Sequence, residues 1–315
     1  MKITSSAPGK LILFGEHASS RNRPAIVFAV TSRLKANLIP STNSDSDILL
    51  SSESLGVKDA IYPSKKLDLV SKTISIFFEK TLCQPEPLDL QIKSSIIPGF
   101  GSSAAAIATT LGMFDAYYET NLTKWELLQL AVDANYAIKG YGSGLDLGAA
   151  IYGGMIRYQK GIEPEKLPFE HLNLVIGNTR VKAPSGPIVK SVKEFEKCNA
   201  TLAYDIFNQL EEIVEKAIIA LKSKDNETLG LLMNKNQELL RVLNVSSPIL
   251  EELIDAANEN DALGAKLSGA GIGDNMIALV TAETKEKIIA AINQTKGQVL
   301  SSISIDPQGL IVSKK

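Results

Sequence analysis

The stretch GFGSSAAA, residues 99–106, follows a segment typical of a β-strand (88–97) and opens an alanine-rich segment (103–118) typical of an α-helix. A glycine turn between a strand and a helix directs backbone N–H groups and the positive end of the helix dipole at one point. Small side chains let an anion approach, so the turn predicts a phosphate cradle. No Gly-Lys-Ser/Thr closes it, which separates it from the Walker pattern. The alternative is an ordinary serine-capped helix with closely packed alanines.

Two more glycine-rich turns follow, GYGSGLD at 140–146 and KLSGAGIGD at 266–274. In the first, Asp146 beside a phosphate and a cation could orient or deprotonate a substrate hydroxyl. Its alternative is a turn aspartate that bonds its own backbone. The second turn joins a helix to the apolar strand 276–280, and its small residues indicate close approach of a ligand or a flexible connection.

A lysine stands near the N-terminus in the sequence APGK, residues 7–10. Beside a reacting hydroxyl, Lys10 would lower the pKa of that hydroxyl and help to hold the charge of a transferred phosphoryl group. Most lysines are solvated, and that is the alternative for Lys10 taken alone.

The length of 315 residues and the hydrophobic content of 44% predict two domains, because single cores rarely grow beyond about 250–300 residues. Segments of strand and helix spacing alternate in both halves, which favours an α+β fold. Short strands are predicted at 11–14 and 25–30, and a helix is predicted at 124–139, with Thr123 as its N-cap and Glu126 three residues on. The charged, proline-containing stretch 160–171 is the predicted linker. We therefore expect domains at 1–170 and 171–315.

Composition excludes several classes of partner. Lys and Arg number 33 against 35 Asp and Glu, a net charge of −2, so no basic field is available for nucleic acid or an acidic membrane. The first residues lack a signal-peptide apolar core, and no apolar run of about 20 residues follows. Cys83 and Cys198 are far apart, which indicates neither a disulfide framework nor a zinc site. A soluble protein of the reducing cytoplasm is expected.

In this order, the lysine segment and the three glycine turns resemble the GHMP kinases. The run APGKLILFGEH at 7–17, with Pro-Ala-Ile at 24–26 and Asn-Thr-Arg-Val at 178–181, is most similar to the mevalonate kinase group. The resemblance implies an N-terminal domain like domain 2 of ribosomal protein S5 and a ferredoxin-like C-terminal domain. It also implies an ATP-dependent kinase of the mevalonate (isoprenoid) pathway that uses Mg²⁺.

The resemblance further implies roles for individual residues. Lys10 matches the lysine beside the acceptor hydroxyl, and Asp146 matches the catalytic aspartate. The phosphates of ATP would lie over the first turn, with Mg²⁺ at Ser103. The expected nucleotide-binding residues are Gly99, Gly101, Ser102, Ser103, Ala104, Gly269 and Gly271, and the expected substrate residues are Glu16, His17, Arg21, Arg23, Ser143 and Ser268.

Three departures leave the acceptor open. Asn135 stands eleven residues before Asp146, where mevalonate kinases usually have a Mg²⁺-binding Glu. The sequence from Gly142 to Asp146 looks more like phosphomevalonate kinase. Arg21 and Arg23 replace apolar residues and could grip an extra phosphate on the acceptor, or be plain surface residues. The predicted reaction is transfer of the γ-phosphoryl group of ATP to mevalonate, and mevalonate 5-phosphate and mevalonate 3-phosphate remain the alternative acceptors.

Two further alternatives remain. The same fold could bind ATP as a sensor or structural subunit, although Lys10, Asp146 and Ser103 together favour catalysis. The helical residues 203–258 are expected to complete the core, with a homodimer contact as the weaker interpretation.

Overall fold

The computed structural model describes residues 1–41, 47–140 and 142–315, so Tyr141 of the second glycine turn lies outside the described residues. The chain forms two compact units. The first comprises residues 1–10, 29–154 and 306–315, and the second comprises 11–28 and 155–305. The prediction of two domains, each made of one continuous stretch and divided at residue 170, stays a prediction. Each of the two compact units instead combines separate stretches of the sequence. The predicted α+β composition is confirmed.

The sheet of the first unit has the strand order β12-β1-β2-β5-β3-β4. Its strands are β1 (Ile3–Phe14), β2 (Ala25–Pro40), β3 (Ile48–Ser52), β4 (Val57–Ile61), β5 (Leu88–Ser94) and β12 (Ile311–Lys314). Along β2, Leu34, Ala36 and Leu38 are buried while Lys35 between them is exposed. This alternation places one face of the sheet against a core.

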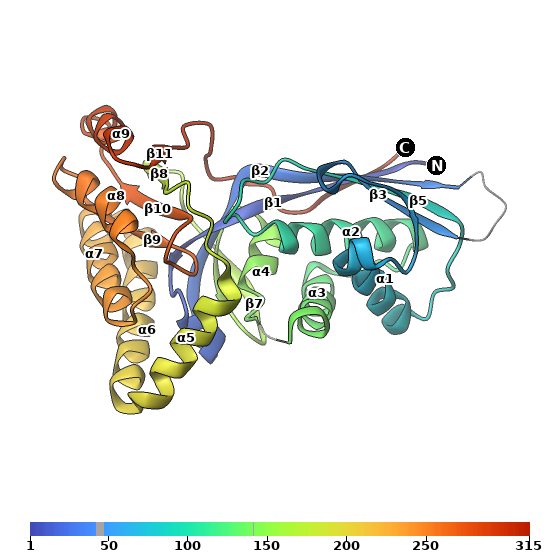
Figure 1. Ribbon diagram of the computed structural model, residues 1–315, viewed down its shortest axis with the longest axis horizontal. Helices are drawn as coiled ribbons and strands as arrows, with labels where there is room; N and C mark the ends of the chain where they lie inside the picture. The colour runs from blue at the N-terminus through green and yellow to red at the C-terminus, as the bar shows by residue number, and fades with distance from the viewer. Residues whose placement is uncertain (42–46, 141) are drawn as a thin grey trace. The chain divides into compact units, whose positions relative to one another are not determined.

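Helices α1 (Asp68–Thr81), α2 (Ser102–Tyr118), α3 (Lys124–Lys139) and α4 (Leu145–Tyr152) pack together in the first unit. Figure 1 shows α2 running along the sheet with α1 and α3 beside it. Residues from Ala104 to Phe114 of α2 are buried all round, as expected for a central core helix. Phe77 of α1 meets Phe114 edge to face, with ring centroids 5.6 Å apart. The predicted start of α3 is confirmed by a capping box between Thr123 and Glu126.

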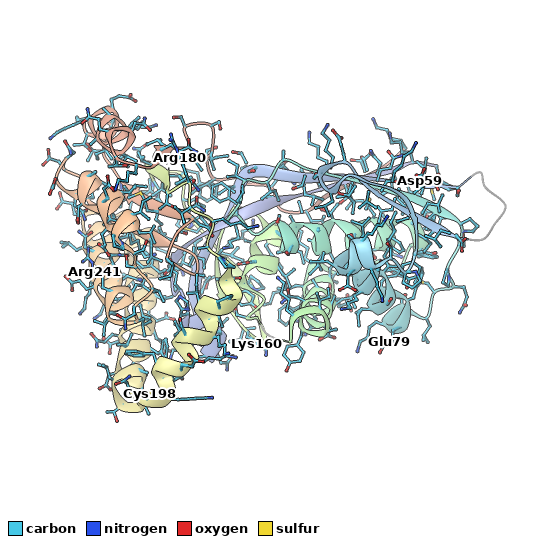
Figure 2. The ribbon with its side chains drawn as sticks, viewed as in Figure 1. Asp59, Glu79, Lys160, Arg180, Cys198 and Arg241 are labelled. Carbon is cyan, nitrogen blue, oxygen red and sulfur yellow. The ribbon has the colours of Figure 1, made fainter. Side chains whose placement is uncertain are left out.

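The second unit contains an antiparallel sheet of order β11-β8-β10-β9. Its strands are β8 (Leu174–Asn178), β9 (Gly264–Ser268), β10 (Asn275–Leu279) and β11 (Gln298–Val299). Helices α7 (Asn226–Val242) and α8 (Pro248–Asn258) pack on β9, and α9 (Lys285–Gln294) packs on β8 and β11. The helices of this unit are α5 (Ser185–Cys198), α6 (Ala200–Ser223), α7 (Asn226–Val242), α8 (Pro248–Asn258) and α9 (Lys285–Gln294). Cys198 at the end of α5 is exposed (Figure 2).

The stretch 160–171, predicted to be a linker, instead contains strand β7 (Ile162–Leu167), which pairs with β6 (Met155–Gln159). That part of the prediction is wrong. Among the described strands β7 pairs with β6 alone, and an edge strand tolerates a proline such as Pro164 because one side of its backbone needs no ladder bonds.

The described residues also contain three short 3₁₀ helices: η1 (Ala18–Arg21), η2 (Glu53–Leu55) and η3 (Lys65–Leu67). None of the helices in the described residues has both the length and the apolar character that crossing a membrane requires.

Candidate active site

The first glycine turn ends at Gly101, which is the N-cap of α2 and has φ 77°. No side chain of the described residues caps this helix end. The alternative of a serine-capped helix is therefore wrong. The N–H groups of the first turn of a helix have no intrahelical acceptor, so those of Ser102 and Ser103 are available to an anion. The positive φ values of Gly99 (87°) and Gly101 suit glycine at both positions.

Lys10 and Asp146 lie against this turn. The Lys10 amide donates to the Phe100 carbonyl at 2.8 Å, which ties β1 to the turn. Lys10 Nζ is 3.5 Å from Asp146 Oδ1, and the lysine side chain is 8% exposed. A Cβ on Gly101 would lie 3.2 Å from Lys10 Cε and 3.5 Å from Asp146 Oδ2. The turn, a cation and a carboxylate therefore meet at one place.

Asp146 stands in the first turn of α4, after the N-cap Gly144 (φ 86°). A carboxylate in this position is stabilised by the helix dipole. Its side chain is 44% exposed, so a substrate hydroxyl can reach it. Ser143 accepts a hydrogen bond from the Leu145 amide at 3.3 Å and so shapes the start of α4.

Asn135 lies on α3, eleven residues before Asp146, and is buried. Its Nδ2 lies 2.7 Å from where a Cβ on Gly142 would be. The amide therefore packs directly against the second glycine turn.

A cavity of about 340 Å³ adjoins the first turn and includes Ser102 and Ser103 in its wall. Its apolar lining comes from η2, η3, α1 and β5 and includes Leu55, Leu67, Leu69, Val70 and Ile92. An apolar slot beside an anion-binding turn suits the flat base of a nucleotide. Sequence reasoning missed these residues, because their pattern is that of ordinary core positions. A larger cavity of about 850 Å³ lies over residues such as Lys35 and Gln91 and contains none of the predicted site residues.

No three His, Cys, Asp or Glu side chains gather into a metal-binding group in the described part of the chain. Mg²⁺ is commonly held by one or two carboxylates, waters and substrate phosphates. Nucleotide loops also use a Ser or Thr hydroxyl for this purpose, and Ser103 lies in the first turn of α2 beside the glycine turn, so its hydroxyl fits a magnesium ion that arrives with a nucleotide.

In the second unit, Glu16 forms an ion pair with Lys266 of β9, and both side chains are completely buried. Lys266 Nζ also donates to the Leu267 carbonyl at 2.6 Å. Burial lowers the pKa of Lys266, and the charge of Glu16 opposes that shift. Lys266 was not predicted as a site residue, because its partner lies 250 positions away in the sequence.

His17 is nearly buried, and its Nε2 lies 3.0 Å from the Ala270 carbonyl. A carbonyl oxygen only accepts hydrogen bonds, so Nε2 carries the hydrogen. Burial lowers the pKa of His17 to about 4; the bond to Ala270 opposes the shift, and the Arg21 charge adds to it. His17 is therefore a neutral imidazole at neutral pH.

The third glycine turn, residues 268–273, is fixed at its first residue. The Ser268 hydroxyl accepts from the Ile12 amide at 2.8 Å and donates to the Ile12 carbonyl at 2.9 Å. Gly269 (φ 114°) and Gly271 (φ 95°) have backbone conformations that favour glycine, and a Cβ on Gly269 would meet nothing within 4 Å. The turn can therefore present backbone N–H groups to an anion.

Arg21 and Arg23 are each held by a carboxylate of the second unit. Arg21 contacts Glu196 through Nε at 3.0 Å and Nη2 at 2.7 Å, and its guanidinium lies 4.2 Å above the Phe207 ring. Arg23 pairs with Glu211. Whether either arginine contacts a substrate stays a prediction.

Two sequence profiles match the chain. The profile described as GHMP kinases N terminal domain matches residues 68–154, and the one described as GHMP kinases C terminal matches residues 217–298. The mevalonate kinase of Pyrococcus furiosus is 32% identical over 338 aligned residues, which cover 100% of this chain and 99% of that protein.

Solved structures show the same fold. The mevalonate kinase of Methanococcus jannaschii matches with a TM-score of 0.78 and 25% identity, covering 95% of this chain and 96% of that one. The phosphomevalonate kinase of Streptococcus pneumoniae, solved with phosphomevalonate and AMPPNP, matches with a TM-score of 0.85 and 19% identity, covering 96% and 99%. The predicted two-domain architecture is confirmed by these matches.

Proposed function

This chain belongs to the GHMP kinase family and is an ATP-dependent phosphotransferase, and we propose that it transfers the γ-phosphoryl group of ATP to mevalonate. Family membership confirms the resemblance drawn from the sequence. The choice of acceptor follows the Pyrococcus furiosus enzyme, whose similarity extends over the whole chain.

The observation that carries the proposal is the meeting of Lys10, Asp146 and the turn at Gly101. Phosphoryl transfer needs little covalent chemistry from a protein, so alignment and charge neutralisation supply most of the catalysis. A half-exposed carboxylate beside a nearly buried lysine provides both a proton acceptor and a fixed positive charge. A module that only binds nucleotide has no need of that pair, which weighs against a sensor or structural role.

On the nucleotide side, the N–H groups of Ser102 and Ser103 would hold phosphate oxygens, while Gly99 and Gly101 keep the turn free of side chains. The small side chain of Ala104, whose own amide donates to the Gly101 carbonyl at 3.0 Å, would leave room for the phosphates. The base would occupy the apolar cavity beside the turn. Gly269 and Gly271 would supply further backbone N–H groups. Mg²⁺, when bound with ATP, would neutralise charge on the phosphate oxygens, and Ser103 is its proposed protein ligand.

On the acceptor side, Asp146 would accept or orient the proton of the attacking hydroxyl, and Lys10 would hold the transferred oxygens. Glu16, His17, Ser143 and Ser268 remain the proposed substrate residues. His17 would contribute as a neutral hydrogen-bonding group, since burial lowers its pKa to about 4.

A phosphorylated mevalonate is the second candidate acceptor, suggested by Arg21 and Arg23 and by the fold similarity to a phosphomevalonate kinase. Both arginines already contact carboxylates. A dianionic phosphate would have to displace Glu196 or Glu211, which disfavours this candidate relative to mevalonate.

The test is ATP consumption by the purified chain with mevalonate, mevalonate 5-phosphate or mevalonate 3-phosphate, each compared with no acceptor. We expect mevalonate to give the highest kcat/KM. Turnover with a phosphorylated acceptor alone would transfer the proposal to that substrate. Nucleotide binding without consumption with any acceptor would favour a sensor or structural role instead.

We also propose a cytoplasmic location, as expected for a pathway enzyme with a small polar substrate. Partners other than the substrate are not proposed, except a homodimer through the helices of 203–258, which size-exclusion chromatography with light scattering would test.

A further inference from the structure

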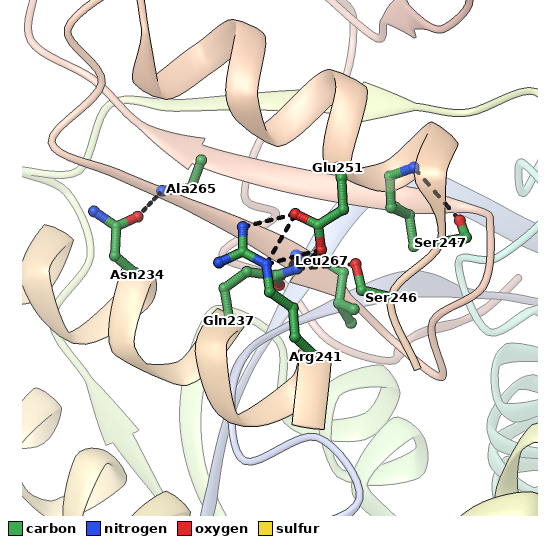
Figure 3. Close-up of polar contacts among 9 residues, drawn as sticks. Asn234, Gln237, Arg241, Ser246, Ser247, Glu251, Ala265 and Leu267 are labelled. Carbon is green, nitrogen blue, oxygen red and sulfur yellow. Dashed lines mark hydrogen bonds and ion pairs between the residues drawn. The ribbon is translucent and has the colours of Figure 1, made fainter. Parts of the chain in front are cut away.

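Strand β9 ends the strand order of its sheet, and α7 side chains satisfy its outer backbone groups. The register with β10 pairs Lys266 with Ile277 and Ser268 with Asn275. The amides of Ala265 and Leu267 lie on the other side of the strand. The Ala265 amide donates to Asn234 Oδ1 and the Leu267 amide donates to Gln237 Oε1, both at 3.0 Å (Figure 3).

Gln237 makes two further bonds that Asn234 lacks in the described structure. Its Nε2 donates to Ser246 Oγ and to Glu251 Oε1, both at 3.0 Å. Arg241 also binds Glu251, and its Nη2 donates a hydrogen bond to Oε2 at 2.6 Å (Figure 3). A carboxylate only accepts hydrogen bonds, so the amide nitrogen of Gln237 faces Glu251 and its oxygen faces Leu267. The orientation of this buried amide is therefore fixed.

These bonds connect the two ends of the third glycine turn. Leu267 directly precedes the turn. Ser246 follows Val245, whose carbonyl accepts a hydrogen bond from the Ile272 amide at 2.7 Å. The same carbonyl lies 2.0 Å from where a Cβ on Gly271 would be, so the turn rests on Val245. Gln237 thus links the strand that leads into the turn with the segment that supports its last residues.

The turn needs such support because its backbone is unusual. Gly269, Gly271, Ile272 and Asp274 all have positive φ, and for Ile272 (φ 66°) that conformation is strained. Strained backbone persists only where the surroundings hold it in place.

We infer that Gln237 is a positioning residue for phosphoryl transfer: it fixes the 268–273 turn so that its backbone N–H groups are preset for the nucleotide. The inference rests on the proposed ATP-dependent function. It assigns Gln237 no contact with ATP.

The test compares Gln237→Met with Asn234→Leu. Each variant removes one side-chain acceptor for a β9 amide and keeps the side-chain volume similar, so both should lower the Tm. Only Gln237→Met should raise the KM for ATP and the Kd for a nucleotide analogue, by about tenfold, the effect of one lost buried hydrogen bond. The KM for mevalonate should change less than the KM for ATP in Gln237→Met, because Ser268 at the start of the turn stays bonded to Ile12.

Hydrogen exchange of the amides in 268–273, measured without nucleotide, gives a readout that does not depend on activity. Exchange should speed up in Gln237→Met and stay unchanged in Asn234→Leu. Ser246→Ala, which keeps the bond to Leu267, should give a smaller change in the same direction. It also provides the test if Gln237→Met fails to fold.

A double variant, Gln237→Glu with Glu251→Gln, exchanges the carboxylate and the amide. It preserves an acceptor for Leu267 and should recover most of the affinity for ATP. Equal KM and exchange rates in wild type and Gln237→Met, or equal effects of Asn234→Leu, would overturn the inference. A wild-type chain that neither binds nor consumes ATP would instead refute the proposed function, and hydrogen exchange would still decide whether Gln237 holds the turn.

Discussion

Replacing Gly101 by alanine is the most direct test of the candidate active site. Gly101 has φ 77°, and an alanine in this left-handed conformation costs about 1–2 kcal/mol. The added Cβ would also lie 3.2 Å from Lys10 Cε and 3.3 Å from Lys10 Cγ. These contacts are shorter than the optimal carbon separation of about 3.5–4.0 Å. Lys10 therefore has to move by a few tenths of an ångström.

The expected catalytic effect follows from that displacement. A misplacement of about 1 Å in a catalytic group costs on the order of a hundredfold in rate, so a shift of a few tenths should lower kcat by about three- to tenfold. Steady-state kinetics with saturating ATP and mevalonate measure the change, and urea unfolding measures the loss of stability.

Gly161→Ala is the matched control. Gly161 has φ 80°, so alanine carries the same backbone cost there, but the added Cβ would meet nothing within 4 Å. We expect Gly161→Ala to lose about 1–2 kcal/mol of stability with kcat unchanged. A folded Gly101→Ala enzyme with wild-type kcat, or an equal loss of kcat in Gly161→Ala, would refute the assignment of the turn to the reacting groups.

Three further outcomes are expected. Asp146→Asn should lower kcat by about 10²–10⁴-fold with the Kd for ATP nearly unchanged; weak ATP binding by the folded variant in calorimetry would contradict the proton-accepting role. Lys266→Met should lower the free energy of unfolding in urea by about 3–5 kcal/mol, because it leaves the buried Glu16 carboxylate without its charged partner. Adding Glu16→Gln should restore part of that loss, and no recovery would argue against a stabilising ion pair. The pKa of His17 is about 4 in the folded chain and 6.5 in the unfolded chain, so the unfolded state binds the proton more tightly. The contribution of His17 to the free energy of unfolding is complete above about pH 6.5, and about 3 kcal/mol is lost as the pH falls through 4. His17→Gln should flatten this part of the curve of stability against pH, and identical curves for the two proteins would exclude the imidazole as the source.

Local sequence patterns predicted the helices better than the strands. The helix predicted at 124–139 is confirmed. Its start was predictable because its capping pair, Thr123 and Glu126, is only three residues apart. Strands predicted at 11–14 and 25–30 are parts of the longer β1 and β2, since glycine and serine in β1 hide its extended character. The stretch 160–171 was misjudged because Pro164 occupies an edge strand, where a proline is tolerated.

The candidate site divides in the same way between local and distant information. Gly99, Gly101 and Asp146 carry their signal in short motifs, whose residue types are required by backbone conformation and by chemistry. The partners of Lys266, Arg21 and Gln237 lie 250, 175 and 30 positions away, and a single sequence contains no record of such pairings.

Arg21 shows the consequence. An arginine near a predicted substrate segment suggests an anion-binding role, but the same guanidinium serves equally to hold Glu196 and to stack on Phe207. Its charge was visible in the sequence, whereas the partner that satisfies it was not. Residues that create a site by their own backbone or charge are therefore predictable from sequence, and residues that act through a distant partner become visible only once the chain is folded.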